Sequence, residues 1–460
     1  MRFLKSFLNF FKNFNHRFIK GSIGTKLSHF VMGVGNICHK QIIKGLLYFA
    51  IQAIFIFIMV MCPLVNNTPL GIMALINLKT LGTNEGTITT MADDSRLMLL
   101  FGVVTIGIII MYLFAWYSNI KSSYKADLDV KQGKKPTSFI SDLKSLFDDR
   151  FHILLLTPTC IAALIFTILP TVFMILIAFT DFGNADKETV EYFFNWSGFD
   201  NFKGVFSSVD SELSRFGDVL LWTFIWAFFA TFTCYFGGII VALLINKKGI
   251  KYKKLWRTIF ILTIATPQFV SLLAVRNLLG TYGPVNELLQ TLNIIDEPIE
   301  FLGNVTLDKA WLAKVMVILI NLWIGMPYTM LMTSGILMNI PTELYEAATI
   351  DGANKTKMFT KITLPYILFV TGPYLISSFV GNITSFNIIY LLTQGGPSFM
   401  DASKAGATDL LVTWLYKLTI DEGIYNVGSV ISIFTFIITA TITLITYRRT
   451  KSYKQEDAFQ

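Results

Sequence analysis

Charged residues are scarce in this sequence, and that scarcity excludes an ordinary soluble domain. Only 15% of the 460 residues are Asp, Glu, Lys or Arg, while 53% are hydrophobic. Soluble domains carry about 25% charged residues. Several apolar runs also exceed the roughly 18 residues that are typical of a transmembrane helix. The composition therefore predicts a multi-pass membrane protein.

Histidine, cysteine and catalytic motifs are also few. The histidines and cysteines are His16, His29, His39, His152, Cys38, Cys62, Cys160 and Cys234. They show no metal-ligand spacing and no C-x-x-C pair, so we expect the cysteines to be free, buried thiols. The H-E-x-x-H, G-x-S-x-G and G-x-x-x-x-G-K-[ST] motifs are absent as well. We therefore predict no catalytic residue, no metal and no cofactor, and an energy source that another subunit binds.

The apolar runs predict an all-α fold with eight transmembrane helices. These helices are expected at residues 45–63, 97–117, 153–179, 217–246, 256–277, 311–333, 366–391 and 426–447. Lys and Arg gather in the loops 121–150 and 247–257 and in the C-terminal tail, whereas the loops 181–212 and 296–308 lean acidic. Basic loops stay on the cytoplasmic side of a membrane. Eight spans with both termini in the cytoplasm satisfy every loop, and the net charge of +8 then needs no nucleic-acid partner.

Composition divides the chain into four regions. They are a basic cytoplasmic N-terminus (1–44), two helices with a basic linker (45–150), a six-helix block (151–447) and a cytoplasmic tail (448–460). The first region contains no acidic residue and interleaves Phe with Lys and Arg at near-helical spacing. This pattern predicts an amphipathic helix that lies on an anionic membrane surface. A cleaved signal peptide is the alternative, but charges interrupt its apolar core and no cleavage site follows.

A polar stretch from Glu346 to Pro365 separates two long apolar runs. Pro341 suits the first turn of a helix, and Glu343 and Glu346 lie near its positively polarised N-terminal end. Gly352 suits the left-handed turn that closes this helix. A second short helix is expected to follow, and Pro365 stops it or bends it into the next span.

Each of these two short helices has a distinct face at helical spacing. The first face comprises Leu344, Ala347, Ala348 and Asp351, and the second comprises Met358, Phe359 and Ile362. Two short helices at about a right angle, with small residues where another protein could approach, predict a docking knob beside the membrane. The alternative is an ordinary solvated loop between spans.

Polar residues within the predicted spans indicate a second site. Asn321, Ile324, Gly325 and Tyr328 share one helix face, and Ser378 and Asn382 share another. We expect Pro327 to break or kink its span at the same depth. Amide, phenol and hydroxyl groups suit hydrogen bonds to sugar hydroxyls, but hydrogen bonding between packed helices explains such residues equally well. The residues alone leave both interpretations open.

Four segments carry a family resemblance. They are EAATIDGANKTKMFTKITLP (346–365), NLWIGMPYTML (321–331), SFVGNITSFNIIYLLTQGGP (378–397) and TDLLVTWLYKL (408–418). Together they resemble the larger permease subunit of maltose/maltodextrin binding-protein-dependent ABC importers. The resemblance is good over residues 151–447 and looser over the first two predicted spans. It implies a six-helix type I permease core preceded by two further helices.

The resemblance also implies which residues act. By position, the sugar site comprises Asn321, Ile324, Gly325, Tyr328, Ser378 and Asn382, with Ile324 where the family usually has Leu. The ATPase-coupling loop (341–365) contributes Glu346, Ala347, Ala348, Asp351, Gly352, Phe359, Ile362, Leu364 and Pro365. Two departures stand out: the loop before residue 217 is too short for an extra extracellular domain, and Ile261-Leu262-Thr263 lacks a common proline. The kink of the fifth span is thus left to Pro267.

The implied complex lies in the bacterial cytoplasmic membrane. It comprises a second homologous permease, two cytoplasmic ATP-binding subunits and an extracellular solute-binding protein that delivers maltose or maltodextrin. An importer for another oligosaccharide or a polyol fits the same residues. A secondary transporter or channel fits less well, because the spans contain almost no intramembrane acids. A membrane-embedded enzyme lacks any convergent set of acid, base or metal ligands.

Overall fold

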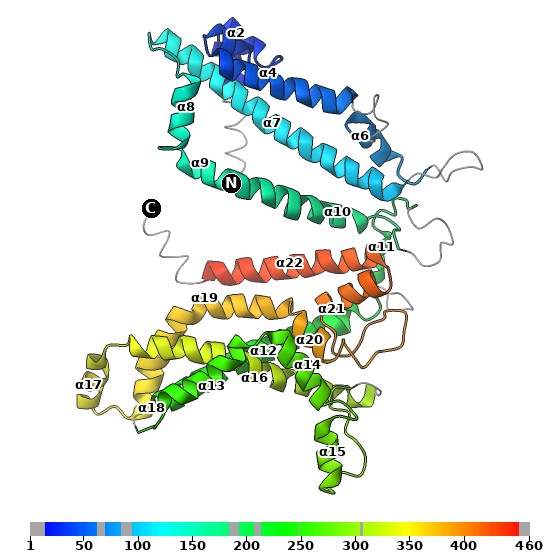
Figure 1. The fold of residues 1–460 in the computed structure, drawn as a ribbon, viewed down its shortest axis with the longest axis vertical. Helices are drawn as coiled ribbons and strands as arrows, with labels where there is room; N and C mark the ends of the chain where they lie inside the picture. Colours follow the sequence, from blue (N-terminus) through cyan, green and yellow to red (C-terminus); the bar gives the residue numbers. More distant parts are fainter. Residues whose placement is uncertain are drawn as a thin grey trace. The chain divides into compact units, whose positions relative to one another are not determined.

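The chain is almost entirely helical in its computed structural model (Figure 1). The structure describes residues 14–61, 70–83, 94–183, 193–206, 213–247, 249–303 and 307–449. Within these ranges, extended pairing is confined to two isolated bridges, Thr180 with Trp196 and Ser398 with Gly406. The chain forms two compact units, Met1–Ser197 and Gly198–Gln460.

The first unit is built from three long apolar helical segments and several short helices. Its helices are α2 (Ile23–Leu27), α3 (Val34–Cys38), α4 (Ile42–Ile56), η1 (Phe57–Met61), α6 (Ile72–Lys79), α7 (Ser95–Lys131), α8 (Phe139–Leu146), α9 (Phe151–Ala163), η2 (Leu164–Ile168) and α10 (Leu169–Ile177). The Asp94 side chain accepts hydrogen bonds from the amides of Arg96 and Leu97, which fixes the start of α7. Most of the predicted Phe-rich N-terminal helix lies outside the described residues.

The second unit contains the remaining helices. They are α11 (Asp200–Lys203), η3 (Gly204–Phe206), α12 (Phe216–Asn246), α13 (Lys253–Ala265), α14 (Gln268–Leu278), α15 (Pro284–Thr291), η4 (Leu307–Lys309), α16 (Ala310–Met338), α17 (Thr342–Ile350), α18 (Lys355–Met358), η5 (Phe359–Thr363), α19 (Leu364–Ile383), α20 (Asn387–Leu392), α21 (Leu411–Tyr416), η6 (Lys417–Asp421) and α22 (Tyr425–Arg449). Helix α12 packs against α16, where Trp226 and Val317 are completely buried in one apolar cluster.

The predicted number of spans agrees with the helices observed. Seven described helical segments are long and apolar enough to cross a membrane, and α13 with α14 makes an eighth if the pair counts as one span. This pair bends by 93° at a break that includes Pro267. Proline lacks the amide hydrogen that would continue the helix. The prediction that Pro267 alone bends the fifth span is therefore confirmed.

Two predicted spans end elsewhere than expected. The span predicted at 97–117 belongs to α7, which continues to Lys131. The span expected at 366–391 ends at Ile383 and is followed by the separate helix α20. The chain turns there, because the Ser385 amide donates to the Asn382 carbonyl across a turn. Of the two effects predicted for Pro327, the break is wrong, since α16 continues from Ala310 to Met338, and the kink stays a prediction.

The coupling segment and the cysteines also differ from expectation. Of the two effects predicted for Pro365, the stop is wrong, because α18, η5 and α19 follow one another without interruption. A bend into the next span stays a prediction. Cys234 is buried as predicted, whereas Cys38 and Cys160 are exposed. Helix α9, which carries Cys160, buries none of its side chains within the chain. Cys62 lies outside the described residues.

Candidate functional site

The loop between α16 and α19 forms a short helix, a left-handed turn and a second helix. Pro341 directly precedes α17, and Glu343 lies in the first turn. Gly352 has φ = 75°, which is the left-handed conformation predicted for it. The Gly352 amide donates to the Thr349 carbonyl and the Ala353 amide donates to Ala348, both within 3.0 Å. This pair of bonds is a Schellman motif, so Gly352 closes α17 as its position in the sequence predicts.

Helix α17 presents an uncovered face. Glu343, Glu346 and Ala347 are exposed, and Ile350 is 87% exposed. Glu346 and Ala347 each lie three or four residues from both Glu343 and Ile350, so all four residues lie on the same side of the helix. Ile350 was not singled out from the sequence, although its spacing from Glu346 was a usable signal. A large aliphatic side chain exposed beside a carboxylate and a small residue is typical of a protein-docking surface.

Helix α17 is connected to the long helices α12, α16 and α19 by side-chain contacts. The Tyr345 hydroxyl lies 2.8 Å from the Thr363 hydroxyl, which joins α17 to η5. Phe359 packs against a cluster that contains the buried residues Tyr235, Ile336 and Ile367 from α12, α16 and α19. Ile362 and Leu364 are half-buried, and Pro365 is exposed. These contacts connect α17, through η5, to the helices that hold the predicted solute residues.

The predicted solute residues of α16 lie at different depths. Asn321 is buried, and its amide group donates to the Ala230 carbonyl and the Cys234 sulfur of α12, both at 3.4 Å. Gly325 faces the same thiol, because a β-carbon added there would lie 2.8 Å from the Cys234 sulfur. Ile324 is half-buried, whereas Tyr328 is 52% exposed. Asn321 thus serves helix packing in this conformation, which is one of the two roles that the sequence allowed.

The predicted residues of α19 also approach α12. The Asn382 amide donates to the Thr231 hydroxyl at 2.8 Å, and the Asn382 carbonyl accepts from the Trp226 indole at 3.1 Å. Ser378 is half-buried. Tyr374 precedes it by one turn, and its ring centroid lies 5.4 Å from that of Tyr328. Tyr374 was missed from the sequence, although its four-residue spacing from Ser378 indicated the same face.

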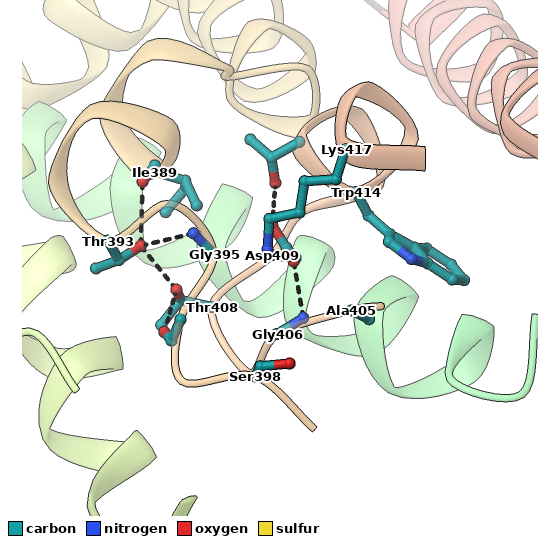
Figure 2. Close-up of polar contacts among 12 residues, drawn as sticks. Ile389, Thr393, Gly395, Ser398, Ala405, Gly406, Thr408, Asp409, Trp414 and Lys417 are labelled. Carbon is teal, nitrogen blue, oxygen red and sulfur yellow. Dashed lines mark hydrogen bonds and ion pairs between the residues drawn. The ribbon is translucent and has the colours of Figure 1, made fainter. Parts of the chain in front are cut away.

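A second polar centre lies at the opposite end of the unit from α17, beside α20 and α21 (Figure 1). Figure 2 shows Asp409 between Gly406 and Lys417. Asp409 is completely buried, and its carboxylate accepts from Lys417 Nζ at 2.6 Å, the Gly406 amide at 2.8 Å and the Thr413 hydroxyl at 2.9 Å. Burial raises the pKa of Asp409 despite these donors.

Asp409 helps to close a rigid loop between α20 and α21. The Thr393 and Thr408 hydroxyls lie 2.8 Å apart, and Thr408 also donates to the Gly396 carbonyl at 2.7 Å. Gly395 has φ = 79° and lies so close to the Asp409 carboxylate that no side chain fits there. The segment 408–418 carries part of the family resemblance, but the pairing of Asp409 with Lys417 was not predicted from the sequence. The sequence does place these opposite charges on either side of a short apolar helix, and this pattern could have indicated the pair.

The polar side chains described above are suited to packing between helices and to binding a solute. Among the described residues, no group of three or more His, Cys, Asp or Glu side chains is placed to hold a metal ion. The polar groups between α12, α16 and α19 are neutral amides, hydroxyls and phenols, which suit a neutral polar solute.

Comparisons with known proteins place these features in a family. Residues 234–451 match the family described as "Binding-protein-dependent transport system inner membrane component". The maltodextrin transport system permease protein MalC of Streptococcus pneumoniae serotype 4 is 33% identical over 436 residues, which cover 93% of this chain and 95% of that protein. The galactooligosaccharides transport system permease protein GanP of Bacillus subtilis is 31% identical over 427 residues, covering 93% and 97%.

A solved structure supports the fold. One chain of a bacterial ABC transporter involved in the import of the acidic polysaccharide alginate superposes with a TM-score of 0.53. That alignment has 23% sequence identity and covers 67% of this chain and 98% of the other. Because MalC is more than 30% identical along nearly the whole length of both proteins, this chain belongs to the binding-protein-dependent transport system inner membrane components, the multi-pass permease subunits of ABC importers in the cytoplasmic membrane.

Proposed function

We propose that this chain is one permease half of an ABC importer for maltodextrins. One observation carries the proposal: a maltodextrin permease matches 93% of the chain, including both of its compact units. A homologous second permease completes the transmembrane path. Two ATP-binding subunits supply the energy, since the chain offers no nucleotide motif of its own.

The proposed docking point for an ATPase is α17. Its exposed face offers Glu346 as an ion-pair partner for a basic side chain, Ala347 for close approach and Ile350 for apolar contact. Gly352 fixes the direction in which the chain continues toward α18. Closure of the ATPases moves α17, and the contact of Phe359 with the α12, α16 and α19 cluster carries this movement into the membrane.

The proposed sugar site lies between α12, α16 and α19. The exposed ring of Tyr328 and the half-buried ring of Tyr374 supply aromatic surface that suits the apolar face of a pyranose ring. Ser378, Asn321 and Asn382 supply hydroxyl and amide groups, and Ile324 and Gly325 shape the wall. The side chains of Asn321 and Asn382 exchange their contacts with α12 for sugar hydroxyls when the helices separate, because these contacts are hydrogen bonds between neutral groups.

The proposed topology places both termini and α17 in the cytoplasm. Basic loops beside the predicted spans support this orientation. The loop closed by Asp409 then faces outward, where a solute-binding protein delivers the sugar. We retain residues 151–447 as the proposed permease domain. The described chain separates instead after Ser197, so that α9 and α10 fall in the first unit.

Galacto-oligosaccharides are the second candidate substrate. GanP, whose name assigns it to their transport, is 31% identical over 93% of this chain. A neutral set of amides and hydroxyls does not distinguish an α-linked glucose chain from a galactose chain.

The deciding experiment measures ATP hydrolysis by the assembled complex in lipid. We expect stimulation by the solute-binding protein loaded with maltotriose and little stimulation by the same protein offered a galactotriose. The reverse order would replace the maltodextrin proposal with the galacto-oligosaccharide one. In parallel, Glu346→Lys is expected to abolish stimulation. Asp148→Lys makes the same change in charge at an exposed position between α8 and α9, and it is expected to retain most of the stimulation. Equal activity of Glu346→Lys and the unmodified complex would contradict the docking assignment.

A further inference from the structure

The first unit encloses a cavity that the transport proposal does not use. It lies between α4, α7, α8 and the start of α9, and it has a volume of about 660 Å³. Cavities of about 300–1,000 Å³ hold small-molecule ligands in proteins. In Figure 1, α8 connects the end of α7 to the beginning of α9.

One end of the cavity is rich in positive charge. Lys44, Lys121, Lys125 and Arg150 line it, whereas Asp129 and Asp142 are the acidic residues in its wall. Lys44 is already paired with Asp142 at 2.6 Å. Lys121, Lys125 and Arg150 are exposed and form no ion pair with any described residue. This end therefore offers three cations to an anionic group.

The other part of the cavity wall is apolar. Leu47 and Ile51 of α4, Leu143 and Leu146 of α8 and Ile153 of α9 line it. Lys44 and Ile51 are separated by seven residues of one helix, which corresponds to a rise of about 10 Å. The wall thus changes from charged to aliphatic along the direction in which α4 enters its membrane-spanning part. A ligand with a charged head and a hydrocarbon body matches this change.

Hydrogen bonds hold the cavity walls together. The Gln41 side chain donates to the Thr137 carbonyl at 2.7 Å, and the Lys44–Asp142 ion pair joins α4 to α8. The Tyr48 and Ser118 hydroxyls, 3.1 Å apart, join α4 to α7. These contacts come from three different pairs of segments. The cavity is therefore part of the folded unit rather than a gap beside a loose linker.

We propose that this cavity binds one anionic phospholipid, with its phosphate at Lys121, Lys125 and Arg150 and its acyl chains along Leu47, Ile51 and Ile153. The bound lipid secures α8 against α4, α7 and α9 at the membrane surface. Basic pockets between membrane-spanning helices are a known type of site for anionic lipid head groups.

Native mass spectrometry of the full chain, purified in detergent, tests this assignment. Phosphatidylglycerol is titrated, and phosphatidylcholine serves as the zwitterionic comparison. We expect one phosphatidylglycerol to bind more tightly than any later one and more tightly than phosphatidylcholine. The variant K121Q/K125Q/R150Q is expected to weaken that first step about a hundredfold, since each cation near a membrane surface contributes roughly fivefold.

A matched variant removes the same charge outside the cavity. K134Q/K135Q/K144Q alters exposed lysines of the same linker that do not line the cavity, and we expect binding of the first lipid to be unchanged. Equal weakening by both triple variants, or equal binding of phosphatidylcholine, would overturn the proposal.

Further measurements distinguish a bound lipid from a bound soluble anion. They also keep the test decisive if the triple variant misfolds. Inorganic phosphate in excess is expected to leave the bound lipid in place, and its displacement of the lipid would identify a soluble anion as the ligand instead. If the triple variant aggregates, K125Q alone is expected to weaken binding roughly fivefold. In addition, Ile51→Trp, which fills the apolar part, is expected to exclude the lipid, and full retention there would contradict the placement of its chains.

Discussion

Asp409 is the described side chain whose replacement we expect to be most costly to the fold of the second unit. Its carboxylate has no exposed surface and faces Lys417 at 2.6 Å. Removing one partner of a buried ion pair costs about 3–5 kcal/mol, because the other charge stays buried without a partner. Asp409→Ala is therefore expected to lower the midpoint of thermal unfolding of the purified complex, measured by intrinsic fluorescence.

Two variants control this measurement. Asp421→Ala removes an exposed carboxylate near the same helices and should leave the midpoint unchanged. The double variant D409L/K417M removes both charges and should recover most of the loss, since apolar replacement of a whole buried pair is often neutral. A midpoint for Asp409→Ala equal to that of the unmodified complex would show that the pair does not stabilise the loop.

Substitution of Tyr328 tests whether its aromatic ring contributes to the proposed sugar site. Because its exposed ring pairs with Tyr374, Tyr328→Ala is expected to raise the half-saturating sugar concentration for uptake about tenfold, corresponding to about 1.4 kcal/mol. Tyr328→Phe keeps the ring and should have a smaller effect. Leu319→Ala, an exposed aliphatic position on the same helix, should have none. Equal half-saturation in Tyr328→Ala would remove Tyr328 from the site.

Gly352 controls the geometry of the docking element. Its φ of 75° suits glycine and asparagine but strains a β-branched residue, while a β-carbon there would meet no neighbouring atom. Gly352→Val should therefore insert into the membrane normally but lose most of the ATPase stimulation, since α17 is then held at another angle. Gly352→Asn should keep it.

ATPase stimulation is measured for Gly352→Val, Gly352→Asn and Gly372→Ala. The comparison distinguishes the effect of backbone strain at Gly352 from the effect of adding a side chain to a glycine. Gly372 is helical and its added β-carbon also meets nothing, so that variant should behave like the unmodified complex. Full stimulation of Gly352→Val would mean that the left-handed turn does not set the coupling angle.

The elements show why some features were predictable from the sequence and others were not. Gly352, Pro267 and the apolar runs act through local backbone chemistry, so their turn, bend and spans were predicted correctly. The depth of Asn321 was not predictable, because it depends on Ala230 and Cys234 about ninety residues away. The end of α19 was missed for a related reason. Polar residues such as Thr384, Ser385 and Asn387 also occur within membrane-spanning helices, so the sequence alone does not reveal that the chain turns there.

At the scale of the whole molecule, the bent helix pair α13 and α14 has a surface that no other part of the described chain covers. Almost all side chains from Ile261 to Val270 are exposed within the chain. We expect the second permease to cover this surface. A photo-reactive phenylalanine analogue in place of Phe269 should cross-link to that subunit in the assembled complex, detected as a heavier band on denaturing gels. The same analogue at Phe436, which is exposed on α22, should give little of this product, and equal products from both would contradict the assignment.

The break between Ala265 and Gln268 has a further consequence for the life of the chain in the cell. Backbone amides and carbonyls released by a 93° bend find no hydrogen-bond partners in lipid hydrocarbon, where each unpaired group costs several kcal/mol. We therefore expect a newly made chain that has not assembled with a partner subunit to be unstable in the bilayer and to be degraded by membrane proteases. The bend makes the lifetime of this subunit depend on the supply of its partner, so synthesis in excess should yield turnover rather than accumulation.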